Sequence, residues 1–245
     1  MRGLEDSYSA NWSGYAQVAS ARSVFTEMTD TFVVPTVATT LPGKQFVADW
    51  VGIGGYEDSG LVQTGIQAEV RTVRHQRMVT YDAWTEHLPQ AEKPLALTVS
   101  PGDTITATVQ ETATNVWDMV VTDDTTSQSA GRVADYKSSG ESAEAINERP
   151  CIKTPCTANH LAELAQTSDI TFDPGFYSVT PPGQAPVLQP LLAASTDTAV
   201  TLSLYDVVMT NNSQTADIAT PSAPDSSGQG FTVADGAVAP DPPSV

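Results

Sequence analysis

The sequence predicts an all-β protein, an antiparallel sandwich or barrel with at most one or two short helices. Threonine, valine and alternating polar and apolar residues dominate the chain, as in strands with one buried face. These segments are short and end at Gly, Pro, Asn or Asp turns at nearly regular spacing. No regular alternation of strands with long helical segments is present, which argues against a parallel βαβ fold.

The strands can be assigned in order along the chain. In GGYEDSGLVQTGIQAEVR (54–71), Val62, Thr64 and Ile66 point to one face, and Gln63 and Gly65 point to the other. SPGD (100–103) and TNNS (210–213) are predicted turns. Further strands are predicted within 25–35, 45–55, 80–88, 95–112, 115–124, 169–174 and 199–220.

Two segments depart from this pattern. Leu161, Leu164 and Ala165 lie at helical spacing, so residues 158–166 are predicted to form a short helix. Residues 141–149 could form either element, although propensity alone favours a helix.

The length of 245 residues and the 40% hydrophobic content allow one large all-β domain with a sizeable core. No internal repeat or interior linker is visible, so we expect one domain over 9–234. Residues 1–8 are expected to be the remnant of a leader, and 235–245 a flexible Pro- and Ala-rich tail. The start of the chain has no hydrophobic stretch. Either the protein is cytosolic or, as we favour, a leader has been removed and the protein is secreted.

The charge balance excludes several partners. Against 29 acidic residues stand only 11 Lys and Arg, a formal net charge of −18. Nucleic acid and anionic membranes are therefore not expected as partners. The acidity could serve solubility, or it could serve tolerance of acid, because self-repulsion is limited once the carboxylates are protonated.

Most catalytic patterns are missing. There is no G-x-S-x-G elbow, and the single D-S-G turn at 58–60 has no second copy to make an aspartic dyad. Cys151 and Cys156, five residues apart, form either a small disulfide loop or two free thiols. Their spacing fits no zinc site, and we expect neither a metal nor a cofactor.

Polar and aromatic residues on strand faces remain. Asp82, Trp84 and Glu86 share a face in one predicted strand. If 141–149 is extended, Glu144 and Glu148 share a face as well. Taken singly, each of these residues is common on strands, and a Trp side chain packs in a core more often than it binds a ligand. Only their combination therefore indicates a functional site.

The chain resembles the glutamic peptidases, or eqolisins, in five blocks: NWSG (11–14), DWVGIGG (49–55), LVQTG (61–65), YDAWTEHLP (81–89) and AEAINERPC (143–151). The blocks occur in the family's order, and the resemblance covers roughly 9–234. It implies a concanavalin A- or lectin-like sandwich of two large antiparallel sheets. It also implies an acid-acting, pepstatin-insensitive endopeptidase that cleaves polypeptides, and we expect it to be a monomer.

Carried over position by position, the resemblance implies that Gln63 and Glu148 are the catalytic pair, and not Gln63 and Glu144. It implies that the cleft is lined or supported by Trp12, Trp50, Trp84, Glu86 and Glu144. It also implies a disulfide between Cys151 and Cys156. The chain departs from the relatives at Gly54 and Gln67, where an acidic residue is frequent.

A Gln and Glu pair can cut a peptide bond. Glu148 can take a proton from water and return it to the leaving nitrogen, while Gln63 positions the water and stabilises the oxyanion without titrating. On this reading Gly65 is expected to leave room for substrate. Two other classes stay open: a carbohydrate-binding module with Trp50 and Trp84 as stacking platforms, and a glycosidase that uses Glu86 and Glu148.

Overall fold

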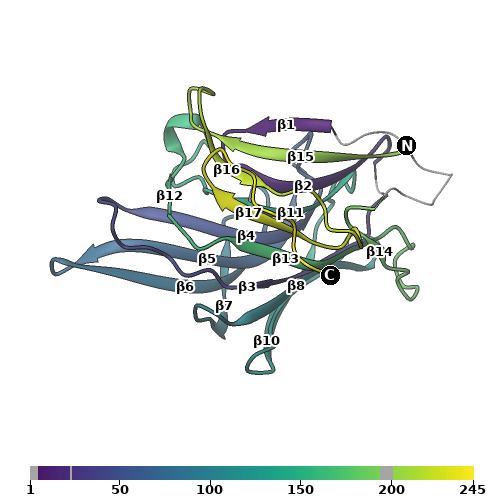
Figure 1. Cartoon of the computed structure of the whole chain (residues 1–245). Helices are drawn as coiled ribbons and strands as arrows, with labels where there is room; N and C mark the ends of the chain where they lie inside the picture. Colours follow the sequence, from purple (N-terminus) through teal and green to yellow (C-terminus); the bar gives the residue numbers. More distant parts are fainter. Residues whose placement is uncertain (1–4, 23, 194–200) are drawn as a thin grey trace.

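The computed structural model describes residues 5–22, 24–193 and 201–245, and these residues form an all-β structure, as predicted from the sequence (Figure 1). One 3₁₀ turn, η1 (Ala158–His160), is the only helical element among them. The strands are β1 (Glu5–Ser9), β2 (Trp12–Ala19), β3 (Glu27–Val33), β4 (Gln45–Ile53), β5 (Val62–Val73), β6 (Gln76–His87), β7 (Lys93–Thr98), β8 (Thr104–Ala113), β9 (Val116–Asp123), β10 (Gln128–Asp135), β11 (Ser142–Glu148), β12 (Glu163–Leu164), β13 (Ile170–Ser178), β14 (Gln189–Pro190), β15 (Leu202–Thr210), β16 (Asp217–Pro221) and β17 (Phe231–Asp235).

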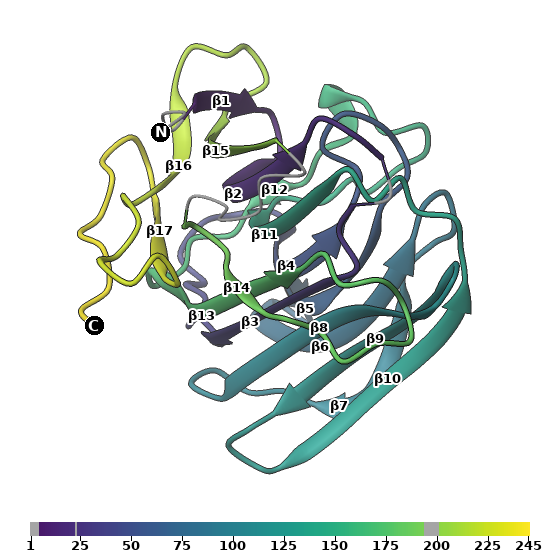
Figure 2. The ribbon, with the colours of Figure 1, turned by 90° about the vertical axis from the view of Figure 1, so that its right-hand side faces the viewer.

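The strands form two antiparallel layers that are continuous at one side. The first layer runs β7-β6-β5-β4-β11-β2-β15, and the second runs β16-β17-β13-β3-β8-β9-β10, with β15 paired to β16. The short strands β1 and β12 pair in parallel with β15 and β4. The outer strands β7 and β10 lie near each other on the opposite side, so the sheet almost closes on itself (Figures 1 and 2).

The space between the layers holds the main hydrophobic core. Ile53, Val62 and Ile66 of the first layer pack into it with Phe32 and Phe172 of the second. Because side chains alternate along a strand, the opposite face of the same strands points away from this core. That outward face of β2, β11, β4, β5 and β6 carries the predicted site.

The helix predicted over 158–166 is wrong. Only the single turn η1 is helical, and no side chain caps its first turn. Glu163 and Leu164 instead form β12, which pairs with β4. Leu161 makes an isolated bridge with Cys151. Pairing with an existing sheet and burial of Ala165 override the weak local helical pattern.

Residues 141–149, ambiguous in the sequence, form β11 at the centre of the first layer. β11 lies between β2 and β4 and hydrogen-bonds to both, which fixes an extended backbone against helical propensity.

Each predicted strand segment overlaps a strand of the structure, but β6 begins and β13 ends four residues beyond the predicted limits, and β2, β10 and β17 were not predicted. Residues 199 and 200 of the last predicted segment lie outside the described residues. Residues 1–4 of the predicted leader remnant also lie outside them, while Glu5–Ser9 form β1. The domain limits stay a prediction. No helix in the described ranges is long and apolar enough to cross a membrane.

Candidate active site

The outward face is organised in rows of side chains across neighbouring strands. Register places Glu144, Gly52, Gln63 and Glu86 side by side on β11, β4, β5 and β6. A second row contains Ile146, Trp50, Gly65 and Trp84, and a third contains Trp12, Glu148, Ala48 and Gln67. The structure therefore brings every residue that was predicted to line or support the cleft onto one face of one sheet.

Gln63 is held by a direct contact with Glu86. Its Nε2 donates a hydrogen bond to Oε2 of Glu86 at 2.6 Å, across the β5–β6 pair. Its Oε1 is buried and has no hydrogen-bonding partner. Trp84 Nε1, on the same face of β6, is also buried without a partner. Buried polar atoms are almost always paired, so an unfilled acceptor and an unfilled donor indicate a place for a ligand or water.

Glu148 is held by two donors. Asn11 Nδ2 donates to Oε1 at 2.8 Å, and Trp50 Nε1 donates to Oε2 at 2.7 Å. Two donors that point at the two oxygens favour the carboxylate form of the side chain. Gln63 and Glu148 make no direct hydrogen bond with each other in the described structure.

The carboxyl groups on this face have shifted pKa values. Burial raises the pKa of Glu148 to about 7; the hydrogen bonds from Asn11 and Trp50 oppose the rise, and the charge of Glu86 adds to it. Burial also raises the pKa of Glu86 to about 7, opposed by its bond with Gln63. The strands of the two carboxyls are separated by β4 and β5, and both side chains belong to the outward face of the sheet.

The tryptophans are part of the supporting structure. Trp50 is 0% exposed and Trp84 is 4% exposed, in a small apolar cluster with Leu61 and Ile146. Trp12 packs edge-on against Trp50, with ring centroids 5.0 Å apart. The burial of Trp50 and Trp84 leaves no open ring face for stacking on a sugar, which argues against the carbohydrate-binding alternative.

Glu144 differs from Glu148 in having no hydrogen-bonding partner for either carboxyl oxygen. It is fully buried, and this burial raises its pKa well above the ordinary value, with a further rise from Glu141 and an opposing effect of Ser142. Burial therefore favours the neutral form of Glu144, whereas two hydrogen-bond donors stabilise the carboxylate of Glu148.

Gly65 does not leave room for substrate, and that expectation is wrong. A Cβ at Gly65 would lie 2.2 Å from the backbone oxygen of Asp49 and 2.7 Å from Cβ of Trp50. The absent side chain allows Trp50 of β4, the pairing partner of Gly65, to lie close against β5 at this position.

Cys151 and Cys156 form a disulfide in the structure, in the loop that follows Glu148. Among the described residues no group of three or more His, Cys, Asp or Glu is arranged to hold a metal ion.

Asn11 is the functional residue that the sequence did not single out. It stands in the NWSG block beside Trp12, but only the tryptophan was selected. Its partner Glu148 lies 137 residues away, and only the register of β2 with β11 reveals the contact.

Comparison with known proteins gives consistent matches. The Peptidase A4 family profile matches residues 10–183. Aspergillopepsin-2 from Aspergillus niger is 25% identical over 187 aligned positions, and the alignment covers 68% of this chain and only 64% of that protein.

Solved structures show the same fold. Scytalido-glutamic peptidase, bound to a peptide-based transition-state analog, is 21% identical with a TM-score of 0.63, and the alignment covers 92% of this chain and 98% of that one. SCP-B, a member of the eqolisin family bound to the tripeptide Ala-Ile-His, is 21% identical with a TM-score of 0.61 and the same coverage. Aspergilloglutamic peptidase from Aspergillus niger is 23% identical with a TM-score of 0.55, covering 78% of this chain and 99% of that one.

Proposed function

We propose that this chain, which belongs to the Peptidase A4 family, is an acid-acting endopeptidase that uses Glu148 and Gln63 as its catalytic pair. The family match over residues 10–183 bears out the resemblance to the glutamic peptidases that was inferred from five sequence blocks. The substrate is a polypeptide, by analogy with the peptide ligands of the structural relatives.

One observation carries the proposal. A carboxyl held by two donors and an amide with an unfilled buried oxygen share the outward face of one sheet. Trp84 Nε1 and the carboxyl oxygens of Glu144 on the same face are also without partners, so several unfilled polar positions are available there to the reacting water and peptide group.

The proposed reaction has two steps. Glu148 as carboxylate removes a proton from water while the water oxygen attacks the peptide carbonyl carbon. The second N–H of Gln63 Nε2, which Glu86 does not use, stabilises the negative charge that forms on the carbonyl oxygen. Glu148 then returns the proton to the peptide nitrogen, the C–N bond breaks, and a carboxylic acid and an amine leave.

The supporting residues have defined roles in this mechanism. Asn11 and Trp50 keep the carboxylate of Glu148 oriented and favour its ionised form. Glu86 fixes the amide plane of Gln63. Trp12 and Trp84 pack around these groups, and Glu144 contributes a neutral buried carboxyl at the end of the row.

The pKa of Glu148 sets the expected pH range. In strong acid only a small part of the enzyme carries the carboxylate that the first step needs, and this part grows as the pH approaches about 7. We therefore expect activity to be low in strong acid and to rise through weak acid.

We also propose that the chain acts as a secreted monomer. The disulfide between Cys151 and Cys156 is typical of oxidising compartments outside the cytosol. A net charge of −18 suits a protein that works where carboxylates are partly protonated.

The test is a digest of denatured protein from about pH 3 to about pH 7 in the presence of pepstatin. We expect cleavage by the wild type, a loss of roughly 10²- to 10⁴-fold in Glu148→Gln, and a loss of roughly 10²- to 10³-fold in Gln63→Ala. Glu163→Gln, on the exposed part of β12, is the matched control that should stay active. Full activity of Glu148→Gln would rule out the proposal, and cleavage of glycans in place of protein would favour the glycosidase.

A further inference from the structure

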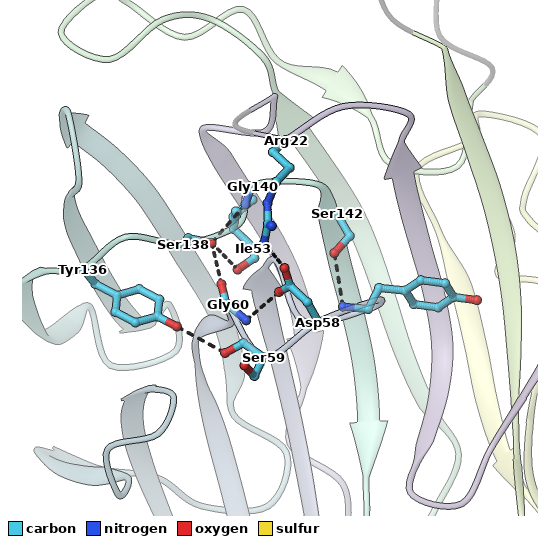
Figure 3. A network of polar contacts seen from close by, with 10 residues as sticks. Arg22, Ile53, Asp58, Ser59, Gly60, Tyr136, Ser138, Gly140 and Ser142 are labelled. Carbon is cyan, nitrogen blue, oxygen red and sulfur yellow. Dashed lines mark hydrogen bonds and ion pairs between the residues drawn. The ribbon is translucent and has the colours of Figure 1, made fainter.

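A cavity of about 600 Å³ lies at the ends of β4, β5 and β6, outside the catalytic pair. Its walls come from the loop around Gly60, from Leu88 after β6, and from residues 136–139 after β10. It therefore sits where loops of the first layer meet the free edge of the second. Figure 3 shows the polar contacts of this region.

The wall of the cavity is held by hydrogen bonds. The Ser138 hydroxyl lies 3.0 Å from the backbone oxygen of Ile53 and 2.7 Å from that of Gly60, and it accepts a bond from the Gly140 N–H (Figure 3). The Tyr136 hydroxyl donates to the backbone oxygen of Ser59 at 3.3 Å. These contacts tie residues 136–140 to the β4–β5 connection.

Gly54 shows how closely this wall is packed. Its φ is +79°, and a Cβ there would lie 2.5 Å from the Ser139 hydroxyl and 2.5 Å from the backbone oxygen of Gly60. No side chain fits at this position, because the hydroxyls of Ser138 and Ser139 and the backbone of Gly60 fill the space.

Two groups in the cavity wall are unmatched. The Ser139 hydroxyl is buried, with the residue 4% exposed, and has no hydrogen-bonding partner. Lys137 is exposed and makes no ion pair within the described part of the chain, whereas Arg22, the other cation in the wall, is paired with Asp58. The Ser139 hydroxyl packs against Gly54 inside the wall, so Lys137 is the group that can meet a ligand in the cavity. An uncompensated ammonium suits a carboxylate.

The cavity is also placed correctly for a peptide substrate. Gly60 precedes Gln63 by three residues, which is roughly 10 Å of extended chain and equals about three residues of an extended peptide. Leu88 belongs to the apolar cluster around Trp50 and Trp84, so one residue borders both the cavity and the catalytic face.

We propose that this cavity is a substrate subsite in which Lys137 binds a carboxylate located about three residues from the cleaved bond. The inference rests on the proposed endopeptidase function and adds a preference for acidic peptides to it. The carboxylate could belong to a Glu or Asp side chain or to the end of the peptide.

The experiment uses peptides with blocked ends in which Glu or Gln stands at each of three positions on either side of the cleaved bond. At about pH 5, where a free glutamate is mostly ionised, we expect Glu to be preferred over Gln by about tenfold in kcat/KM at one position about three residues from the bond. The preference should shrink as the pH falls below about 4, where the substrate carboxylate gains its proton. A Gln peptide with a free C-terminus at that position tests whether a terminal carboxylate can replace the side chain.

The variants decide the assignment. Lys137→Gln should remove the preference while cleavage of the Gln peptides is unchanged. Lys153→Gln, which removes the same charge beyond the opposite end of β11, should keep it. Equal rates for Glu and Gln peptides, or a preference that survives Lys137→Gln, would overturn the subsite.

A binding measurement distinguishes failure of the proposed subsite from failure of the proposed endopeptidase function. If the wild type cuts no peptide at any pH, the endopeptidase proposal fails. Fluorescence anisotropy of labelled peptides bound to the Glu148→Gln variant still tests whether the cavity binds a carboxylate. Tighter binding of the Glu peptide that is lost on adding Lys137→Gln supports the subsite, and equal binding of both peptides contradicts it.

Discussion

The two faces of the central strands use polar groups in opposite ways. On the inward face of β4, Asp49 is fully buried and receives one hydrogen bond, from Asn147 at 2.7 Å, beside a large apolar core. On the outward face, Glu148 receives two donors, and Gln63 keeps an unfilled oxygen. Asp49 Oδ2 also lacks a partner, but it lies beside a packed apolar core, whereas the outward face brings its donors and unfilled atoms together around Gln63 and Glu148. We therefore infer that substitutions on the inward face change stability and those on the outward face change activity.

The largest expected effect on stability belongs to the inward face. Ile66 is fully buried in the main core directly beside the strand positions of Gln63 and Gln67. Ile66→Ala removes buried methyl groups and leaves a cavity, so we expect a loss of about 2–5 kcal/mol in the free energy of unfolding. Chemical denaturation measures this loss, with Gln67→Ala as the outward control at less than about 0.5 kcal/mol. Similar losses in both variants would erase the distinction between the faces.

The second prediction concerns the effect of pH on stability. Burial raises the pKa of Asp49 to about 7 in the folded chain, while an unfolded Asp ionises near about 3.9. Between these values the folded chain binds more protons than the unfolded chain, so the free energy of unfolding falls as the pH rises. The buried Asp30 and Glu144 have pKa values raised in the same direction.

We expect a loss on the order of a few kcal/mol between about pH 4 and about pH 7. Denaturation curves across this range should show it, and Asp49→Asn should flatten the slope because the amide does not titrate. A stability that rises toward neutral pH would contradict the assignment of these groups as neutral acids.

The third prediction concerns the outward face. Asn11→Ala removes one of the donors that lower the pKa of Glu148, so the pKa should rise and the base form become scarcer in acid. We expect kcat/KM in acid to fall by about tenfold, with the acid limb of the pH–rate profile moved to higher pH. An unchanged limb with a lower plateau would mean that Asn11 has a structural role only.

Glu86→Gln should move the acid limb of the pH–rate profile in the direction opposite to Asn11→Ala, and by a smaller amount. The substitution removes the charge that raises the pKa of Glu148, while the new side-chain oxygen can still accept the bond from Gln63. The acid limb should therefore shift to lower pH, with a change of no more than about severalfold in rate. Shifts of Asn11→Ala and Glu86→Gln in the same direction would show that Glu148 does not set the limb.

Much of this arrangement could be predicted from the sequence. Alternation along β5 placed Gln63 and Val62 on opposite faces, and turn residues marked most strand ends. These features depend on local sequence, and local sequence was sufficient for them.

Features that depend on strand pairing could not be predicted from the residues alone. The apolar residues of segment 158–166 have helical spacing, but Glu163–Leu164 form an extended strand that pairs with β4. The missing side chain of Gly65 suggested open space for substrate, but in the structure Trp50 lies close against this position. The bond from Asn11 to Glu148 and the unfilled oxygen of Gln63 also depend on register between distant strands.

The most direct test of the account is a double-mutant cycle of kcat/KM on Gln63→Ala and Glu148→Gln. If both side chains act on the same water and peptide group, the double variant should be about as slow as the slower single variant, because the second loss has nothing left to remove. If the two losses simply multiply, or if either single variant keeps full activity, Gln63 and Glu148 do not form one catalytic pair.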